Sequence, residues 1–438
     1  MFALHTSIVL PYLIGLPLFD CAGSRESMTS HFIKIPVESL EIGMFVSDLD
    51  RSWLESPFLL QGFTINGPEE LQVLRDLCQY VFIDPGLTRP VARDAYRGAG
   101  SELKRHAIKK IFSQHTLRTH QDTRSFEDEL QTASTIYNDY ERLVTNLYDN
   151  YRQNRQLDVA QVSKAIDGIV SSVMRNPDAC TLLSRLRRKD DYTYNHAIGS
   201  SIWAAAMGRQ IGLPVESIKN LSTGLLLCDI GKLNVSSRIL SKTAPLSEAE
   251  ISIVREHVSQ GMEMLKGCEG IHPDVADIVA HHHERYNGSG YPRQLKNDQI
   301  PVFARIAGII DTYDAMINDR PFAAAVAPAD VIARLYTMRD VDFQAELIEE
   351  FIQTIGIYPA GSLVELTNGE VGVVVCESRK RRLRPRILLL LDSAKQALKQ
   401  TRYINLLETT HDERGRPLEI LKGLDPGAHG LDPEELLI

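Results

Sequence analysis

Side chains of the types that commonly bind metals recur through the middle of this 438-residue chain, about every 25 to 32 residues: His196, Cys228, Asp229, His257, His282, His283 and Asp311. A helix and the turn after it take up about that length, so successive helices would each contribute one or two of these residues. Their convergence in one core would bury several ionisable groups, which is costly unless a metal binds them. The spacing therefore predicts a helical bundle built around a metal centre.

Apolar residues repeat with helical spacing across 126–356, for example at Ile136, Tyr140, Leu143 and Leu147. Recurrence at intervals of three and four residues is typical of amphipathic helices. We therefore expect an all-helical domain over this range.

The composition changes on both sides of the helical region. Short apolar runs broken by Gly and Pro over 28–90 predict a small α/β, mostly β, domain with a regulatory role. The polar and charged segment 91–125 is typical of a linker. Strand-like runs separated by an Asn-Gly turn and basic turns predict a small β-module over 357–438, with a loose C-terminal tail. The expected fold class is multidomain and mainly α, with a helical bundle flanked by these two small domains.

Residues 1–27 form an apolar extension of a different character. Its apolar run, Ser7–Phe19, is too short to span a bilayer and contains Pro11 and Pro17. No Lys or Arg precedes the run, as a secretory signal would require. Two explanations remain open: translation begins at Met28, or the segment associates weakly with a membrane. No other stretch of the sequence is expected to be transmembrane.

The charge and the cysteines exclude several classes of protein. The formal charge of −9, from 57 acidic and 48 basic residues, disfavours nonspecific binding to nucleic acid or to anionic membranes. The basic run Ser378–Arg386 lies between strand-like segments and is predicted to be a solvated hairpin turn. The six cysteines lie far apart without a CxxC pair, which indicates neither a disulfide framework nor a zinc ribbon. We expect a reducing, cytoplasmic environment.

The residue types also suggest a reaction. Neighbouring residues of a helix point about 100° apart, so His282 and His283 reach one centre only if each serves a different metal or one lies at the helix end. Asp229 is a good candidate for a carboxylate that bridges two metals. Such a pair lowers the pKa of a water and stabilises both the attacking and the leaving oxygens of a phosphodiester. Lys232, one turn after Asp229, would offer a cation to the phosphate. These residues predict phosphodiester hydrolysis.

Four motifs in this order, LLLCDIGK, EHVSQGMEML, HHHERYNGSGYP and ARIAGIIDTYDAMINDRPF, resemble the HD-GYP family of cyclic di-GMP phosphodiesterases. The resemblance covers about 125–355. In addition, the segment Lys34–Ile65 is similar to the N-terminal domain of uncharacterised function that often precedes HD-GYP in bacterial proteins.

The resemblance implies a role for each matching residue. By this resemblance, the metal ligands are His196, Asp229, His257, His282, His283 and Asp311. It makes Lys232 a phosphate contact or proton donor beside the catalytic Asp229, and it places Tyr291 and Arg320 against the nucleotide. The expected fold is an all-helical HD bundle with two divalent ions, iron or manganese, and the expected product is linear pGpG or GMP. A diguanylate cyclase domain that binds the Gly-Tyr-Pro loop and a second copy of the chain are expected partners.

The sequence departs from the family pattern at three positions. Cys228 stands where the family has the histidine directly before the aspartate, and Asn287 replaces an aspartate of the glycine-rich loop. Tyr192 stands where members with a third metal carry a glutamate, which favours a two-metal site. Cys228 is either a thiolate ligand or a small buried apolar residue of the run LLLC. His281 has no counterpart in the motif and is expected to be a residue of a helix face.

The functional alternatives follow from Cys228. The first hypothesis is a metal-dependent cyclic di-GMP phosphodiesterase. The second is a catalytically degenerate sensor that binds the dinucleotide or metal and acts through protein contacts. A general HD phosphohydrolase for another nucleotide is disfavoured by the Gly-Tyr-Pro loop.

Overall fold

The computed structural model describes residues 33–51, 56, 58, 62–65, 67–83, 107–154, 157–186, 192–268, 270–321, 323–377 and 383–431. Four predictions therefore lie wholly or partly outside the described residues. These are the apolar extension 1–27, the first part of the linker (91–106), the basic segment 378–382 and the end of the tail (432–438). The described residues up to 113 form one compact unit, and those from 114 onward form another.

The N-terminal unit is a small antiparallel sheet with one helix. Its strands are β1 (Ile33–Pro36), β2 (Phe45–Leu49), β3 (Phe63–Thr64) and β4 (Tyr80–Ile83), in the order β1-β4-β2-β3. Helix α1 (Pro68–Leu77) begins with a proline, whose missing N–H costs nothing at a first helical position, and carries two glutamates in its first turn. Val46, Val81 and Leu74 are fully buried in the core between the sheet and this helix. The predicted small, mostly β domain is confirmed.

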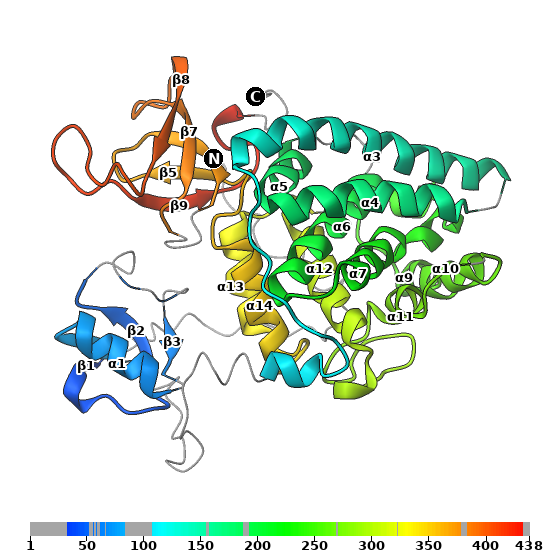
Figure 1. Ribbon diagram of the computed structural model, residues 1–438, viewed down its shortest axis with the longest axis horizontal. Helices are drawn as coiled ribbons and strands as arrows, with labels where there is room; N and C mark the ends of the chain where they lie inside the picture. Colours follow the sequence, from blue (N-terminus) through cyan, green and yellow to red (C-terminus); the bar gives the residue numbers. More distant parts are fainter. Residues whose placement is uncertain are drawn as a thin grey trace. The chain divides into compact units, whose positions relative to one another are not determined.

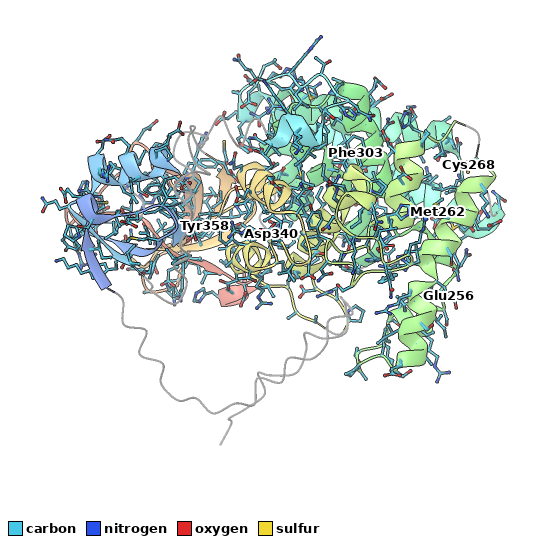
Figure 2. The ribbon with its side chains drawn as sticks, turned by 90° about the horizontal axis from the view of Figure 1, so that it is seen from below. Glu256, Met262, Cys268, Phe303, Asp340 and Tyr358 are labelled. Carbon is cyan, nitrogen blue, oxygen red and sulfur yellow. The ribbon has the colours of Figure 1, made fainter. Side chains whose placement is uncertain are left out.

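The second unit contains the helical bundle (Figure 1). Its helices are α3 (Phe126–Asn154), α4 (Val159–Arg175), α5 (Pro177–Leu186), α6 (Tyr192–Ile211), α7 (Val215–Leu227), α8 (Ser237–Leu240), α9 (Glu248–Arg255), α10 (His257–Lys266), α11 (Pro273–His281), α12 (Val302–Ile317), α13 (Pro328–Thr337) and α14 (Ala345–Ile355), with a 3₁₀ turn, η4 (Ile230–Asn234), after α7. Helices α9 and α10 follow one another through Glu256 (Figure 2). The predicted all-helical domain is confirmed.

Helix α6 lies at the centre of the bundle and packs against α4, α5, α7, α12 and α14. It is buried on nearly all sides, as expected for a helix with small or apolar residues all round, here GSSIWAAAMG. Small side chains let neighbouring helices approach closely, as where Gly208 packs against Ile218. Any polar side chain that α6 projects from its buried surface must therefore find its partner inside the protein.

The C-terminal part of this unit is a five-stranded antiparallel sheet. Its strands are β5 (Leu363–Leu366), β6 (Val371–Cys376), β7 (Arg386–Leu391), β8 (Ala397–Asn405) and β9 (Ile420–Leu424), in the order β8-β7-β6-β5-β9. Val364, Val374 and Leu389 are fully buried in its core. The predicted β-module is therefore confirmed, and with it the multidomain, mainly α fold class. Among the described residues, no helix is both long and apolar enough to cross a bilayer.

Candidate metal centre

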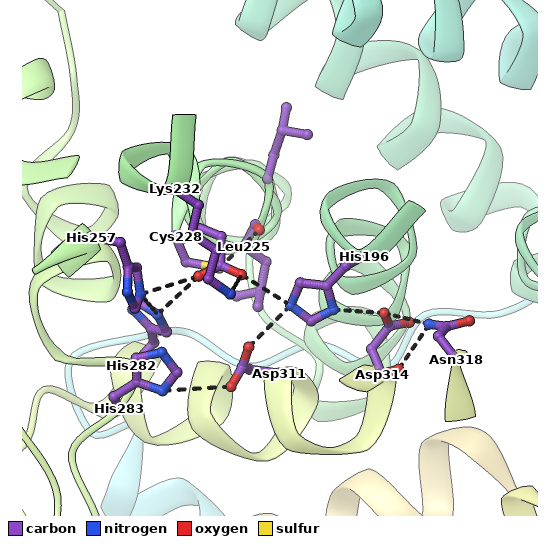
Figure 3. A network of polar contacts seen from close by, with 12 residues as sticks. His196, Leu225, Cys228, Lys232, His257, His282, His283, Asp311, Asp314 and Asn318 are labelled. Atoms are coloured by element: carbon purple, nitrogen blue, oxygen red, sulfur yellow. Dashed lines mark hydrogen bonds and ion pairs between the residues drawn. The ribbon is translucent and has the colours of Figure 1, made fainter. Parts of the chain in front are cut away.

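Figure 3 shows a buried polar cluster that includes Lys232, His257 and Asp311. Asp229 lies at the centre of this cluster, in the turn between α7 and η4. Its Oδ1 atom lies 3.2 Å from His257 Nε2 and 3.8 Å from His282 Nε2. Its Oδ2 atom lies 3.6 Å from His196 Nε2 and 2.5 Å from Lys232 Nζ. The two oxygens of one carboxylate therefore face two different sets of side chains.

Asp311 on α12 joins the second set. Its Oδ1 atom lies 3.1 Å from His196 Nε2, and its Oδ2 atom lies 3.8 Å from His283 Nδ1. The predicted residues thus form two groups whose possible ligand atoms lie within 4.8 Å of one another: Asp229, His257, His282 and His283, and His196, Asp229 and Asp311. Ligand atoms about 2.0–2.2 Å from one ion lie within about 4.4 Å of each other. Each group is close to the size that a divalent ion requires, and Asp229 belongs to both.

Two atoms of the cluster have the environment of metal ligands rather than of hydrogen-bonded groups. Asp229 Oδ1 and His283 Nδ1 are buried, yet neither forms a hydrogen bond with the described residues. Buried polar atoms are seldom left in this state, because each lost hydrogen bond is costly. A set of imidazoles and carboxylates is also the donor chemistry that first-row divalent metals accept. The residues present therefore fit a metal centre.

The backbone around the centre fixes which nitrogen of each imidazole faces it. His257 Nδ1 lies 2.6 Å from the carbonyl oxygen of Val254, and His282 Nδ1 lies 3.2 Å from that of Ile278. A carbonyl oxygen can only accept a hydrogen bond, so each Nδ1 carries the hydrogen. The unprotonated Nε2 atoms then point toward Asp229, as a metal site requires.

His282 and His283 both reach the centre because helix α11 ends at His281. Their ring centroids are 4.0 Å apart, with 44° between the ring planes. The sequence argument that adjacent histidines diverge holds inside a helix, whereas here both residues lie past its end. The structure accordingly places both in the same group, and His283 also faces Asp311.

Burial and charge act against each other on the ionisable groups of the centre. Burial alone would raise the pKa of Asp229, but the charge of Lys232 acts in the opposite direction, and the pKa lies well below its usual value. Burial alone would lower the pKa of His196, but its contacts with Asp311 and Asp314 raise it to about 10. Without metal the cluster is thus a set of carboxylates balanced by protons and a lysine, and divalent cations would supply the same balance.

Two of the three residues predicted to contact a nucleotide touch the predicted ligands. Lys232 Nζ reaches Asp229, while the Tyr291 ring stacks on His283, with ring centroids 4.7 Å apart. Arg320 is partly buried, and burial holds the pKa of its guanidinium group below the usual value, against smaller opposing effects of Tyr192 and Asp311. A cation, Lys232, and an aromatic ring, Tyr291, therefore adjoin the predicted ligands.

Known proteins match most of the chain. An HD domain matches residues 177–347, a domain of unknown function matches 32–162, and a KOW domain associated with the HD domain matches 363–411. A cyclic di-GMP phosphodiesterase of Pseudomonas aeruginosa is 33% identical over 356 residues, which cover 81% of this chain and 84% of that protein. The chain belongs to the HD-GYP family. The resemblance predicted from its motifs is confirmed.

Other relatives match over a shorter range. A cyclic di-GMP phosphodiesterase response regulator of Xanthomonas campestris is 32% identical over 176 residues, 39% of this chain and 47% of that protein. A 3'3'-cGAMP-specific phosphodiesterase of Vibrio cholerae is 26% identical over 265 residues, 59% of this chain and 50% of that protein. The relatives thus share phosphodiesterase names but differ in the dinucleotide that those names specify.

The namesake HD histidine of the HD-GYP family is Cys228 here, and the structure does not bring it into either group of possible ligands. Its side chain is fully buried, and the thiol donates a hydrogen bond to the carbonyl oxygen of Leu225, 3.3 Å away. Burial raises the pKa of the Cys228 thiol well above its usual value, and the charges of Asp229 and Asp311 add to this effect. In this geometry the Cys228 thiol is directed at a backbone carbonyl and lies outside both groups, and its role as a ligand stays a prediction.

Two other residues of the HHHE segment, Glu284 and His281, have structural contacts. Both carboxylate oxygens of Glu284 accept backbone hydrogen bonds, from Arg293 N at 2.7 Å and from Leu295 N at 2.9 Å. Glu284 therefore fastens the loop that carries Tyr291. His281 lies on α11 with Nδ1 3.0 Å from the Asp277 carbonyl oxygen, away from both groups.

Sequence reasoning missed Asp314, a buried residue of α12 that lies 2.9 Å from His196 Nδ1 through Oδ2. The signal was present, because Asp311 and Asp314 are three residues apart and therefore share one face of a helix.

Proposed function

We propose that the chain is a metal-dependent phosphodiesterase that hydrolyses cyclic di-GMP to linear pGpG or GMP. The observation that carries this proposal is the sharing of Asp229 by two groups of possible ligands, with Lys232 against the same carboxylate. Two divalent ions, iron or manganese, would be held by His196, Asp229, His257, His282, His283 and Asp311. The names of the HD-GYP relatives support this substrate class.

The bound ions would supply Lewis acidity to a phosphodiester and lower the pKa of a water. The chain's own residues would orient the substrate. Burial alone would lower the pKa of Lys232, but the carboxylates of Asp229 and Asp311 raise this pKa, so that Nζ keeps its proton. Lys232 would then offer a positive charge to a phosphate oxygen, or a proton to the leaving oxygen.

Tyr291 and Arg320 would hold the nucleotide beside the ions. The Tyr291 ring has a fixed position because it stacks on His283 and lies under the guanidinium group of Arg255, 4.8 Å from the ring centroid. Arg320 carries a charge suited to a phosphate or a guanine carbonyl oxygen. Pro292 and Arg293 next to Tyr291 are exposed, which supports the loop as a surface for a diguanylate cyclase domain.

The decisive experiment is incubation of the manganese- or iron-loaded protein with cyclic di-GMP and separation of the products. We expect pGpG or GMP from the native protein and none from Asp229→Asn, which keeps the shape of the side chain but removes its charge. A parallel incubation with 3'3'-cGAMP tests the alternative substrate suggested by the Vibrio cholerae relative.

The sensor hypothesis makes the opposite prediction. It expects the native protein to bind cyclic di-GMP without releasing product and expects Cys228→His to restore turnover. That pair of results would refute the proposed enzyme.

A further inference from the structure

His196 lies between carboxylates on both sides of its ring (Figure 3). Its Nε2 atom faces Asp311 Oδ1 at 3.1 Å and Asp229 Oδ2 at 3.6 Å, while its Nδ1 atom faces Asp314 Oδ2 at 2.9 Å. In the described part of the chain, Asp314 belongs to neither group of possible ligands. Its contact with His196 therefore differs in kind from those of the other two carboxylates.

Asp314 is itself held in place. Asn318, one turn later on the same stretch of chain, donates its side-chain N–H groups to Asp314 Oδ2 at 2.8 Å and to the Asp314 carbonyl oxygen at 2.8 Å. Asp314 is only 2% exposed, so water does not compete for its carboxylate. One oxygen thus accepts hydrogen bonds from two directions, which fixes the plane of the carboxylate.

The facing helix leaves room for this carboxylate. Gly199 lies on α6 one turn after His196, and a Cβ atom on Gly199 would lie 2.6 Å from Asp314 Oδ1. Carbon and oxygen atoms do not approach so closely without a shift of one of them. The absence of a side chain at Gly199 is therefore what lets Asp314 come within hydrogen-bonding distance of the ring.

We propose that Asp314 is a positioning residue that accepts the Nδ1–H of His196 and so aims the Nε2 lone pair at Asp229 and Asp311. A carboxylate in this position fixes both the tautomer and the orientation of a ligating imidazole, and its loss commonly weakens metal binding about 10- to 100-fold. The inference rests on the metal centre of the proposed function but not on the identity of the substrate.

The test is titration of the metal-free full-length protein with Mn²⁺, with the number of ions and their affinities measured by calorimetry. We expect two ions in the native protein and a loss of about 10- to 100-fold in affinity for one of them in Asp314→Ala. Asp314→Asn keeps an oxygen that can accept the Nδ1–H but removes the charge, so its loss should be smaller.

Two further variants separate positioning from a general loss of stability. Gly199→Ala changes no polar atom, yet it should weaken the same ion because its methyl group displaces Asp314. Glu129→Gln alters another fully buried carboxylate, which binds Arg175 and Ser172, and should leave both Mn²⁺ affinities unchanged. Thermal unfolding of each metal-free variant shows whether it is folded. If Asp314→Ala does not fold, the Mn²⁺ affinities of Gly199→Ala test the positioning role.

The possible failures are distinct. Native protein that binds no Mn²⁺ would overturn the metal centre of the proposed function and this inference with it. If the native protein binds two ions, and Asp314→Ala and Gly199→Ala bind both with the native affinities, the positioning role alone would be overturned.

Discussion

Glu284→Gln should loosen the glycine-rich loop rather than remove a chemical group. The Glu284 carboxylate accepts two backbone N–H bonds, from Arg293 and Leu295, and is buried. Glutamine can accept only one of them and presents an N–H₂ group to the other, so one charge-assisted hydrogen bond of about 1.5–3 kcal/mol is lost. Since about 1.4 kcal/mol corresponds to a factor of ten, local opening of the loop should become about 10- to 100-fold more frequent.

Amide hydrogen exchange followed by mass spectrometry measures this opening directly. We expect faster exchange over residues 286–296, a higher KM for cyclic di-GMP because Tyr291 is less well placed, and little change in the helices. A matched control is Glu263→Gln, since Glu263 is an exposed residue of α10 whose ion pair with Lys266 should contribute about 0–1 kcal/mol.

The reasoning is refuted by one specific result. If Glu284→Gln abolished kcat while exchange in the loop stayed at the native rate, Glu284 would act in the chemistry and not in holding the loop.

Three further outcomes follow from the same contacts. Asp229→Asn should reduce bound metal from two ions to one or none, measured by elemental analysis, because its carboxylate is shared by both groups. Arg255→Ala should raise KM a few-fold at low salt with kcat unchanged, and the effect should shrink at 0.5 M salt, because Arg255 is an exposed cation over the Tyr291 ring. Burial alone would raise the pKa of Glu129, but Arg175 and Ser172 lower this pKa below the unfolded value near 4.5. The ionised Glu129 carboxylate therefore stabilises the fold above pH 4.5, and this stabilisation is lost as the pH falls through the lower folded pKa. Glu129→Gln should therefore lower the free energy of unfolding at pH 7 by about 3 kcal/mol and flatten its decline below pH 4.5, as measured by urea unfolding across pH 3–7.

The helical domain could be predicted because its information is local. Apolar spacing predicts helices, and the recurrence of His196, Asp229, His257 and Asp311 at about one helix and turn predicts their convergence. The structure does bring these residues together. Their role as ligands stays a prediction that metal analysis can test.

The contacts of individual side chains could not be read from spacing. Cys228 and Asp229 are neighbours in sequence, yet only Asp229 faces the histidines, while the Cys228 thiol donates to the Leu225 carbonyl oxygen. Glu284 follows two histidines that face the centre, but the backbone folds so that its carboxylate meets amides nine and eleven residues later. Such contacts depend on where the chain turns back, which no local pattern encodes.

The residues of the centre come from five separate structural elements, and this has a consequence for the lifetime of the protein. Helices α6, α10, α11 and α12 and the α7–η4 turn all meet at Asp229, although they are spread over 116 positions of sequence, from His196 to Asp311. Ions held there would act as cross-links between these helices, in addition to their apolar packing and to contacts such as that of His196 with Asp314. By mass action, a ligand present at 100 times its Kd stabilises the folded state by about 2.7 kcal/mol. A cell short of metal would therefore hold a bundle that opens more often and is degraded sooner, so that metal supply would set the amount of this protein as well as its activity.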